Sequence, residues 1–197
     1  FIIILFIDWL LIFPLAIIFV VWGILYNNKK FEWKSNPWLG LLSNILCGYL
    51  LLLSGVLYNR GEAFGVFEII LLSVKYTIPF LFAYSSIVLL TNIPDTEGDK
   101  SVNKRTFTLH FGIKTTIVVS TIFCLISFLI GIYINEPLSS TSALTALPFF
   151  LFALFRGKKK DILRSIRYPI FLLNFYVITI YPLLLLPVMI FYYISKY

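Results

Sequence analysis

The residues best suited to chemistry are three carboxylates, Asp95, Glu97 and Asp99, which lie within five residues of one another between two long apolar runs. Asp95 and Asp99 are four residues apart, so in a helix they share one face, about 6 Å apart along the axis. Two carboxylates held that close repel each other unless a positive charge lies between them. Hard oxygen ligands beside a membrane suit Mg²⁺, which binds through one or two carboxylates and takes its other ligands from water and substrate phosphate. The alternative is a solvated acidic loop that serves solubility.

The segment Thr91 to Gly112, TNIPDTEGDKSVNKRTFTLHFG, resembles the second aspartate motif of the UbiA superfamily of intramembrane prenyltransferases. That motif is a DxxxD within IPDxEGD, followed by Gly-x-x-Thr-Leu and a closing LG. Asn103 stands where the family usually has Gly, and Asn tolerates the left-handed backbone that Gly would supply. The resemblance implies a membrane prenyltransferase that moves an isoprenoid from its diphosphate to an aromatic acceptor of the quinone-precursor type, with Mg²⁺ as cofactor.

The resemblance also implies roles for particular residues. Asp95 and Asp99 would be the catalytic pair that holds the metal, because Mg²⁺ and fixed cations stabilise the charge that a leaving diphosphate gains as an allylic C–O bond ionises. The nearest fixed cations follow the motif directly, and an arginine among them can bind phosphate oxygens in a bidentate manner. The residues expected to bind substrate are Lys100, Lys104, Arg105, Tyr26, Lys30, Asn92 and Asn44.

Tyr26 and Lys30, within YNNKK, match the YxxxK spacing that members of this superfamily carry after an earlier span. Tyr and Lys are also the ordinary interfacial residues at the ends of spans. Asn44 resembles a recurrent Asn near the family's cavity, and a helix-packing hydrogen bond explains it equally well. Phe80 and Tyr84, which precede the motif, are candidates for lining the cavity of the alkyl chain; simple core packing is the alternative.

The composition independently indicates a membrane protein. Apolar residues make up 60% of the 197 residues and charged residues 13%, and a soluble domain of this length has no interior large enough for that much apolar surface. Open strands cannot cross lipid, and the period-2 alternation of a barrel is absent, so the runs are predicted to be helices. The expected fold is an all-α polytopic transmembrane helix bundle in a lipid bilayer, and no nucleic-acid partner is expected.

The apolar runs predict the spans. A turn at Asp8 and Trp9 would follow the first of them, and Pro169, Pro182 and Pro187 would kink the last one without ending it. The resemblance implies that residues 1–197 form a single, N-terminally truncated prenyltransferase domain of a nine-span fold. The predicted spans are about 1–7 (partial), 10–26, 38–58, 67–92, 113–134, 141–155 and 168–194.

Basic residues predict the orientation of the bundle. The connections at 27–37, 93–114 and 156–167 together hold 13 of the 16 Lys and Arg residues, whereas the alternate connections and the C-terminal tail hold only Arg60 and Lys196. The positive-inside rule therefore places the three basic connections, which include the candidate site, in the cytoplasm. The expected location is a bacterial or archaeal cell membrane.

One part of the family pattern is missing. The family carries a first motif of the NDxxDxxxD kind in an earlier loop, and the four carboxylates before Asp95 include no pair at i, i+4. The sequence thus supplies half of the expected diphosphate site, and we expect this polypeptide alone to be inactive. Two alternatives stay open: a transporter-like or interaction membrane protein without catalysis, and a phosphoalcohol-transferring membrane enzyme, although the DGxxAR…GxxxDxxxD pattern of the latter is absent.

Overall fold

The computed structural model describes residues 9–59 and 65–195. Several predictions fall outside this part of the chain: the partial span at 1–7, the interfacial Asp8, and the positions of Arg60 and Lys196. All other predicted spans and all candidate site residues lie within it.

The described chain consists of helices joined by short connections, without a strand, which confirms the predicted all-helical bundle. Five of the described helical stretches are long and apolar enough to cross a membrane: Trp9–Tyr26, Pro37–Tyr58, Val66–Thr91, Ile113–Tyr133 and Pro137–Arg156. The first combines a 3-10 turn, α2 (Ile12–Ile18) and wider π-helical turns at Phe19–Tyr26. The other elements are α3 (Pro37–Tyr58), α4 (Val66–Thr91), α5 (Thr96–Ser101), α6 (Phe107–Phe111), α7 (Ile113–Tyr133), α8 (Pro137–Arg156), α9 (Lys159–Ile180) and α10 (Leu185–Ser195).

The helix expected at 141–155 begins earlier, at Pro137, because its N-terminus is capped. The Glu136 carboxylate accepts hydrogen bonds from the backbone N–H groups of Leu138 (3.2 Å) and Ser139 (2.6 Å), and proline is well suited to the first helical position. The cap satisfies donors that otherwise lack partners at a helix start.

The prediction of a single helix over 168–194 is wrong. α9 begins nine residues before that range, at Lys159, and ends at Ile180; a 3-10 turn at Pro182–Leu184 then leads into α10. Pro182 has no N–H and disfavours the helical conformation of the residue before it, and Tyr181 accordingly has φ −122° and ψ 70°. Pro169, in contrast, lies inside α9 as predicted.

The long helices pack in chain order. α2 lies against α3, α3 against α4, α4 against α7, α7 against α8, and α8 against α9, while α4 also contacts α9. A buried apolar cluster between α4, α7, α8 and α9 includes Leu90, Cys124 and Phe150. α7 and α8 approach closely at Gly131, where an added Cβ would lie 2.9 Å from the Ser139 hydroxyl oxygen. Small residues allow such close contacts in membrane bundles.

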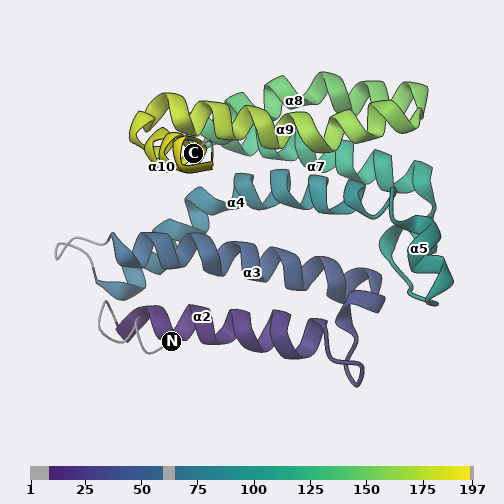
Figure 1. The fold of residues 1–197 in the computed structure, drawn as a ribbon, viewed down its shortest axis with the longest axis horizontal. Coiled ribbons are helices and arrows are strands. Elements are labelled where there is room, and N and C mark those ends of the chain that lie inside the picture. Colours follow the sequence, from purple (N-terminus) through teal and green to yellow (C-terminus); the bar gives the residue numbers. More distant parts are fainter. Residues whose placement is uncertain (1–8, 60–64, 196–197) are drawn as a thin grey trace.

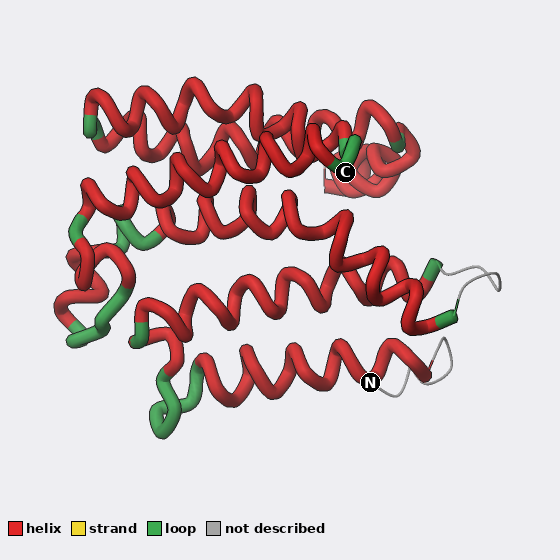
Figure 2. The backbone as a smooth tube through the Cα atoms, turned by 180° about the vertical axis from the view of Figure 1, so that it is seen from behind, coloured by secondary structure: helices red, strands yellow, loops and turns green. Residues whose placement is uncertain are grey.

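The three basic connections lie at one end of the bundle. In Figure 1 the α2–α3 connection, the segment with α5, and the α8–α9 turn are all at the right-hand end, while the α7–α8 turn lies at the other. Figure 2 shows the same arrangement from behind, with helices running between two sets of loops. The three connections that are rich in basic residues therefore lie together at one end of the bundle, as their alternation along the sequence predicts.

This arrangement gives a prediction of sidedness. We expect a membrane-impermeant thiol reagent, applied to intact cells, to label a cysteine placed at position 60 or 137 and to leave cysteines at 30, 104 and 159 unlabelled, because basic connections remain in the cytoplasm. The native Cys47 and Cys124 are both buried and give little background. Permeabilised cells, in which all five positions should react, are the control. External labelling at position 104 would reverse the orientation.

Candidate active site

The motif segment folds as a short helix beyond the end of α4. This helix is α5 (Thr96–Ser101), and we call it the motif helix. The Thr96 hydroxyl donates to the backbone oxygens of Ile93 (2.7 Å) and Asn92 (3.1 Å), which turns the chain after α4. The Asp99 N–H donates to the Asp95 carbonyl at 2.8 Å. That bond closes one helical turn, so the two carboxylates have the i, i+4 relation that the sequence predicts.

Asp99 and Asp95 have different surroundings. Asp99 is 8% exposed, and Lys104 Nζ lies 2.7 Å from its Oδ1. The Lys104 N–H also donates to the Asp99 carbonyl at 3.0 Å, so the loop closes on itself. Asn103, with φ 54°, adopts the left-handed conformation expected where the family has Gly. Asp95 is exposed and has no ion pair with any other described residue.

The donor set of this helix fits a hard divalent cation. Asp95 and Asp99 offer carboxylate oxygens one helical turn apart, and Mg²⁺ is commonly held by one or two carboxylates with water and substrate phosphate completing the shell. Within residues 9–59 and 65–195 no group of three or more His, Cys, Asp or Glu side chains is close enough to hold a metal by itself. The residues therefore fit a metal that binds together with a substrate.

A basic pocket lies beside the motif helix. It has a volume of about 480 Å³, and its positive charge balances the acidic motif helix next to it. Its lining residues are Lys100, Asn103, Lys104, Arg105, Leu109 and His110. Three of the four cations predicted to bind substrate, Lys100, Lys104 and Arg105, are thus brought together, with Lys104 also engaged by Asp99.

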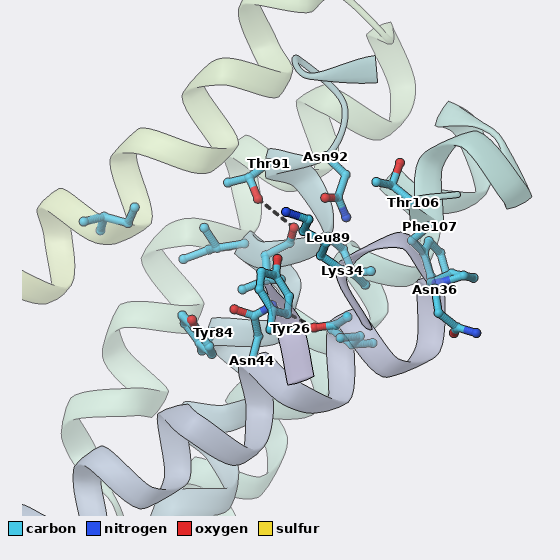
Figure 3. Close-up of a pocket in the computed structure, with 16 residues that line it drawn as sticks. Tyr26, Lys34, Asn36, Asn44, Tyr84, Leu89, Thr91, Asn92, Thr106 and Phe107 are labelled. Atoms are coloured by element: carbon cyan, nitrogen blue, oxygen red, sulfur yellow. Dashed lines mark hydrogen bonds between the residues drawn. The ribbon is translucent and has the colours of Figure 1, made fainter. Parts of the chain in front are cut away.

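A second, polar pocket of about 370 Å³ lies between the end of the π-helical turns at Phe19–Tyr26, the start of α3 and the end of α4. Figure 3 shows the side chains of Tyr26, Lys34 and Asn92 directed into a common space. Lys34 is the one charged residue among the described residues that line this pocket, and none of them is a carboxylate. The polar lining residues are Tyr26, Lys34, Asn36, Asn44, Tyr84, Thr91, Asn92 and Thr106.

The start of α3 fixes one wall of the polar pocket. The Asn36 side chain accepts from the N–H groups of Trp38 (3.0 Å) and Leu39 (3.1 Å), which is a standard N-cap. The Trp38 ring contacts the rings of Phe107 and Phe111 edge-on, with centroids 5.7 and 5.6 Å away. These contacts join α3 to α6, so the chain on both sides of the motif is held against the pocket.

An apolar pocket of about 380 Å³ adjoins the polar one within the helical bundle. The two pockets share Tyr84, Ile87 and Ile170 as lining residues. Phe80 and Tyr84, predicted as lining residues of an alkyl cavity, both line the apolar pocket. Side chains of α3, α4, α7, α8 and α9 contribute to its wall, which is why no single stretch of sequence identifies it.

The structure separates the predicted substrate-binding residues into groups. Tyr26, Asn44 and Asn92 line the polar pocket, although the Asn44 side-chain amide also donates to the Gly40 carbonyl at 2.7 Å within α3. Lys30 is exposed and lines none of the pockets described here. The lysine of this connection that lines the polar pocket is Lys34, whereas the sequence predicted substrate binding by Lys30. In the sequence, the Asn36-Pro37 pair indicates the start of α3. It therefore places Lys34 in the last turn before that helix, and this signal could have identified Lys34 as the lysine of the pocket.

Asp95 and Asp99 line neither the polar nor the apolar pocket. Asp99 reaches the basic pocket through its ion pair with Lys104, and Glu97 lines a smaller pocket against the α8–α9 turn. The acidic pair and the polar pocket are nevertheless close in the chain, since Thr91 and Asn92 of the pocket end α4 and Asp95 follows three residues after Asn92.

The chain is similar in sequence to known prenyltransferases. The model of the UbiA prenyltransferase family matches residues 1–176. The chain is similar to a 2-acyl-4-prenylphloroglucinol 6-prenyltransferase, chloroplastic, from Humulus lupulus, with 30% identity over 131 residues. That alignment covers 60% of this chain and 30% of the relative, so the chain spans under a third of the relative's length. No solved structure matches the chain significantly.

Proposed function

Since the chain belongs to the UbiA prenyltransferase family, we propose that the product of its complete gene transfers an isoprenoid from its diphosphate to an aromatic acceptor, with Mg²⁺ as cofactor. One observation carries the proposal: a polar pocket in which a lysine is the only charged residue among the described lining residues adjoins an apolar pocket within the bundle, and the two share three lining residues. A prenyl diphosphate has the same division into a charged head and an apolar tail.

The apolar pocket is proposed to hold the isoprenoid chain. Isoprenoid carbons make no hydrogen bonds, so they gain free energy only where they displace water or lipid from apolar walls. Leu51, Phe80 and Phe150 supply such walls from three different helices. This pocket also keeps water away from the reacting carbon, which protects an allylic cation from hydrolysis.

The diphosphate is proposed to lie between the polar pocket and the motif helix. Asp95 and Asp99 would hold the metal, and Mg²⁺, when bound, would neutralise charge on the leaving diphosphate. Lys100 and Arg105 would contact phosphate oxygens from the basic pocket. Lys104 balances the charge of Asp99 while no metal is bound, since their ion pair is 2.7 Å long.

The proposed reaction breaks the allylic C–O bond and forms a C–C bond to a ring carbon of the acceptor. The electron pair of the broken bond leaves with the diphosphate, and the ring carbon then loses a proton to restore aromaticity. Fixed cations contribute because the diphosphate gains negative charge only as the bond breaks, so their attraction is greater in the transition state than in the substrate complex.

The acceptor is proposed to be an electron-rich aromatic ring. The relative's name describes prenylation of an acylphloroglucinol, a ring whose hydroxyl groups donate electrons to the carbon that is attacked. A quinone precursor has the same property, and both fit the sequence-based expectation. Family membership favours this activity over the transporter-like and phosphoalcohol-transferring alternatives.

A second set of carboxylates, of the kind that the family carries in its first motif, is proposed to complete the metal site. The motif helix supplies acidic groups on one side only, and the polar pocket has no carboxylate among its described lining residues. A diphosphate with up to three negative charges needs more positive charge than one metal on one flank provides. With the basic end in the cytoplasm, the released diphosphate would enter the cytosol.

Photoaffinity labelling tests the proposed substrate position. The product of the complete gene, in nanodiscs with Mg²⁺, is irradiated with a prenyl diphosphate that carries a diazirine near the end of its chain. We expect labelled peptides from the walls of the apolar pocket, at 48–52, 80–87, 142–150 or 169–174, and we expect unlabelled geranylgeranyl diphosphate to suppress them. Labelling confined to α10, none of whose described side chains lines this pocket, would contradict the proposal.

A further inference from the structure

We propose that Lys34, and not the Lys30 of the YxxxK spacing, is the cation of the α2–α3 connection that binds the diphosphate head of the substrate. This inference rests on the proposed function and adds a specific anion-binding residue to it. Lys34 is half-buried in the polar pocket, and no carboxylate lies among the pocket's described lining residues. Lys34 also forms no ion pair with another described residue.

An ammonium group in this position needs an anion. A charge that is partly removed from water loses hydration, and the loss is offset only when a partner of opposite charge or hydrogen-bond acceptors replace the water. Tyr26 and Asn92, which point into the same space, supply neutral hydrogen-bonding groups. The pocket therefore offers one positive charge and two polar groups to a ligand that must bring the negative charge itself.

The backbone before α3 is shaped so that it presents Lys34. Glu32 has φ 42°, a left-handed conformation that is costly for a residue with a side chain. The turn that follows is held by the Ser35 N–H donating to the Glu32 carbonyl (2.8 Å) and the Asn36 N–H donating to the Trp33 carbonyl (3.1 Å). The N-cap at Asn36 then fixes the other side. Lys34 is thus anchored both before and after its own turn.

Lys30 lacks these features. It is exposed, and the side chain of Asn28 accepts a hydrogen bond from its backbone N–H at 2.9 Å within an exposed turn. Three residues, the left-handed Glu32 among them, separate it from the pocket-lining lysine. Spacing alone suggests that Tyr26 and Lys30 act together, whereas the folded connection brings Lys34 to the pocket that Tyr26 lines.

The shape of the site selects the class of anion. Because the polar pocket adjoins the apolar one, sharing Tyr84, Ile87 and Ile170, its ligand carries phosphate oxygens at one end and a hydrocarbon chain at the other. A prenyl diphosphate and an anionic phospholipid both have this chemistry. We propose the prenyl diphosphate as the ligand, because its head carries more negative charge than the headgroup of an anionic phospholipid. It also fits a pocket that reaches into the bundle.

Equilibrium binding of radiolabelled geranylgeranyl diphosphate tests the inference. The product of the complete gene is placed in phosphatidylcholine nanodiscs with Mg²⁺. Loss of a charge-assisted hydrogen bond should raise Kd about 10-fold or more in Lys34→Gln, and Lys34→Arg should recover part of the affinity. Lys29→Gln, an exposed lysine of the same connection that lines no pocket described here, is the matched control with an unchanged Kd. Lys30→Gln should have a clearly smaller effect than Lys34→Gln.

The possible outcomes are distinct. Wild-type protein that binds the diphosphate, together with Lys34→Gln that binds it equally well, overturns the assignment of Lys34 and leaves the proposed function intact. A greater loss in Lys30→Gln than in Lys34→Gln also overturns it. Wild-type protein that does not bind the diphosphate overturns the proposed function and this inference together. Phosphatidylglycerol in the nanodiscs should compete weakly; displacement of the diphosphate by this lipid at equal affinity in wild type would assign the pocket to a lipid headgroup.

Discussion

Replacing Asp99 by Asn is expected to lower the rate of prenyl transfer by about 100-fold or more, the scale found when one electrostatic group of an active site is removed. Asn keeps the shape of the side chain and removes its charge, so the proposed metal would lose an anionic ligand while the helix keeps its turn. Asp99 also holds Lys104 at 2.7 Å, and the substitution would release that lysine. Steady-state kinetics of the product of the complete gene, at saturating Mg²⁺, measure the effect.

Two further variants separate metal binding from loop stability. Asp95→Asn should cause a similar loss, and it disturbs no ion pair because Asp95 is exposed and has none within the described chain. Glu97→Gln is the matched control in the same helix: its side chain projects about 200° away from that of Asp95 and lines the pocket against the α8–α9 turn. Wild-type turnover in the Asp99→Asn enzyme would show that Asp99 has no role in the active site.

The motif segment could be predicted closely from the sequence because its structure is decided locally. The spacing of Asp95 and Asp99 predicts a shared helix face, and the Asp99 N–H to Asp95 carbonyl bond produces it. Asn103 was expected to accept a left-handed backbone, and it has φ 54°. In both cases the deciding interactions lie within a few residues of chain, so propensities and spacing carry the necessary information.

The fold class could also be predicted, since a bilayer leaves helices as the main way to satisfy the backbone of so apolar a chain. The prediction of one continuous last helix is wrong at Pro182. The apolar character of residues 168–194 favours one long helix, but a proline disfavours the helical conformation of the residue before it. The resulting turn at Pro182–Leu184 divides one expected helix into α9 and α10.

The pockets could not be predicted, because contacts distant in sequence create them. Lys34 becomes a pocket residue through the left-handed Glu32 and through the Trp38 contacts with Phe107 and Phe111. The partners in those ring contacts are about seventy residues apart in the chain. A short motif such as YxxxK records spacing along a helix, whereas the helix ends at Tyr26 and the connection beyond it folds back.

Removal of Mg²⁺ is expected to have the largest effect of all, reducing prenyl transfer to the uncatalysed background. Every fixed cation near the motif is a monovalent side chain, and one of them, Lys104, is already engaged by Asp99. Without a divalent ion, Asp95 and Asp99 would repel the diphosphate instead of helping to bind it. If Asp95 and Asp99 hold the metal as proposed, the carboxylate pair would make the site dependent on metal for binding as well as for bond breaking.

The most direct test of the account is Mg²⁺-dependent product formation. Membranes containing the product of the complete gene are incubated with geranylgeranyl diphosphate and a panel of phenolic acceptors, and prenylated products are sought by mass spectrometry. We predict a product with Mg²⁺, none with EDTA, and recovery when excess Mg²⁺ is added back, with Asp99→Asn membranes as the control for other enzymes. Product formation that persists unchanged in EDTA, or that is equal in wild-type and Asp99→Asn membranes, would contradict the account.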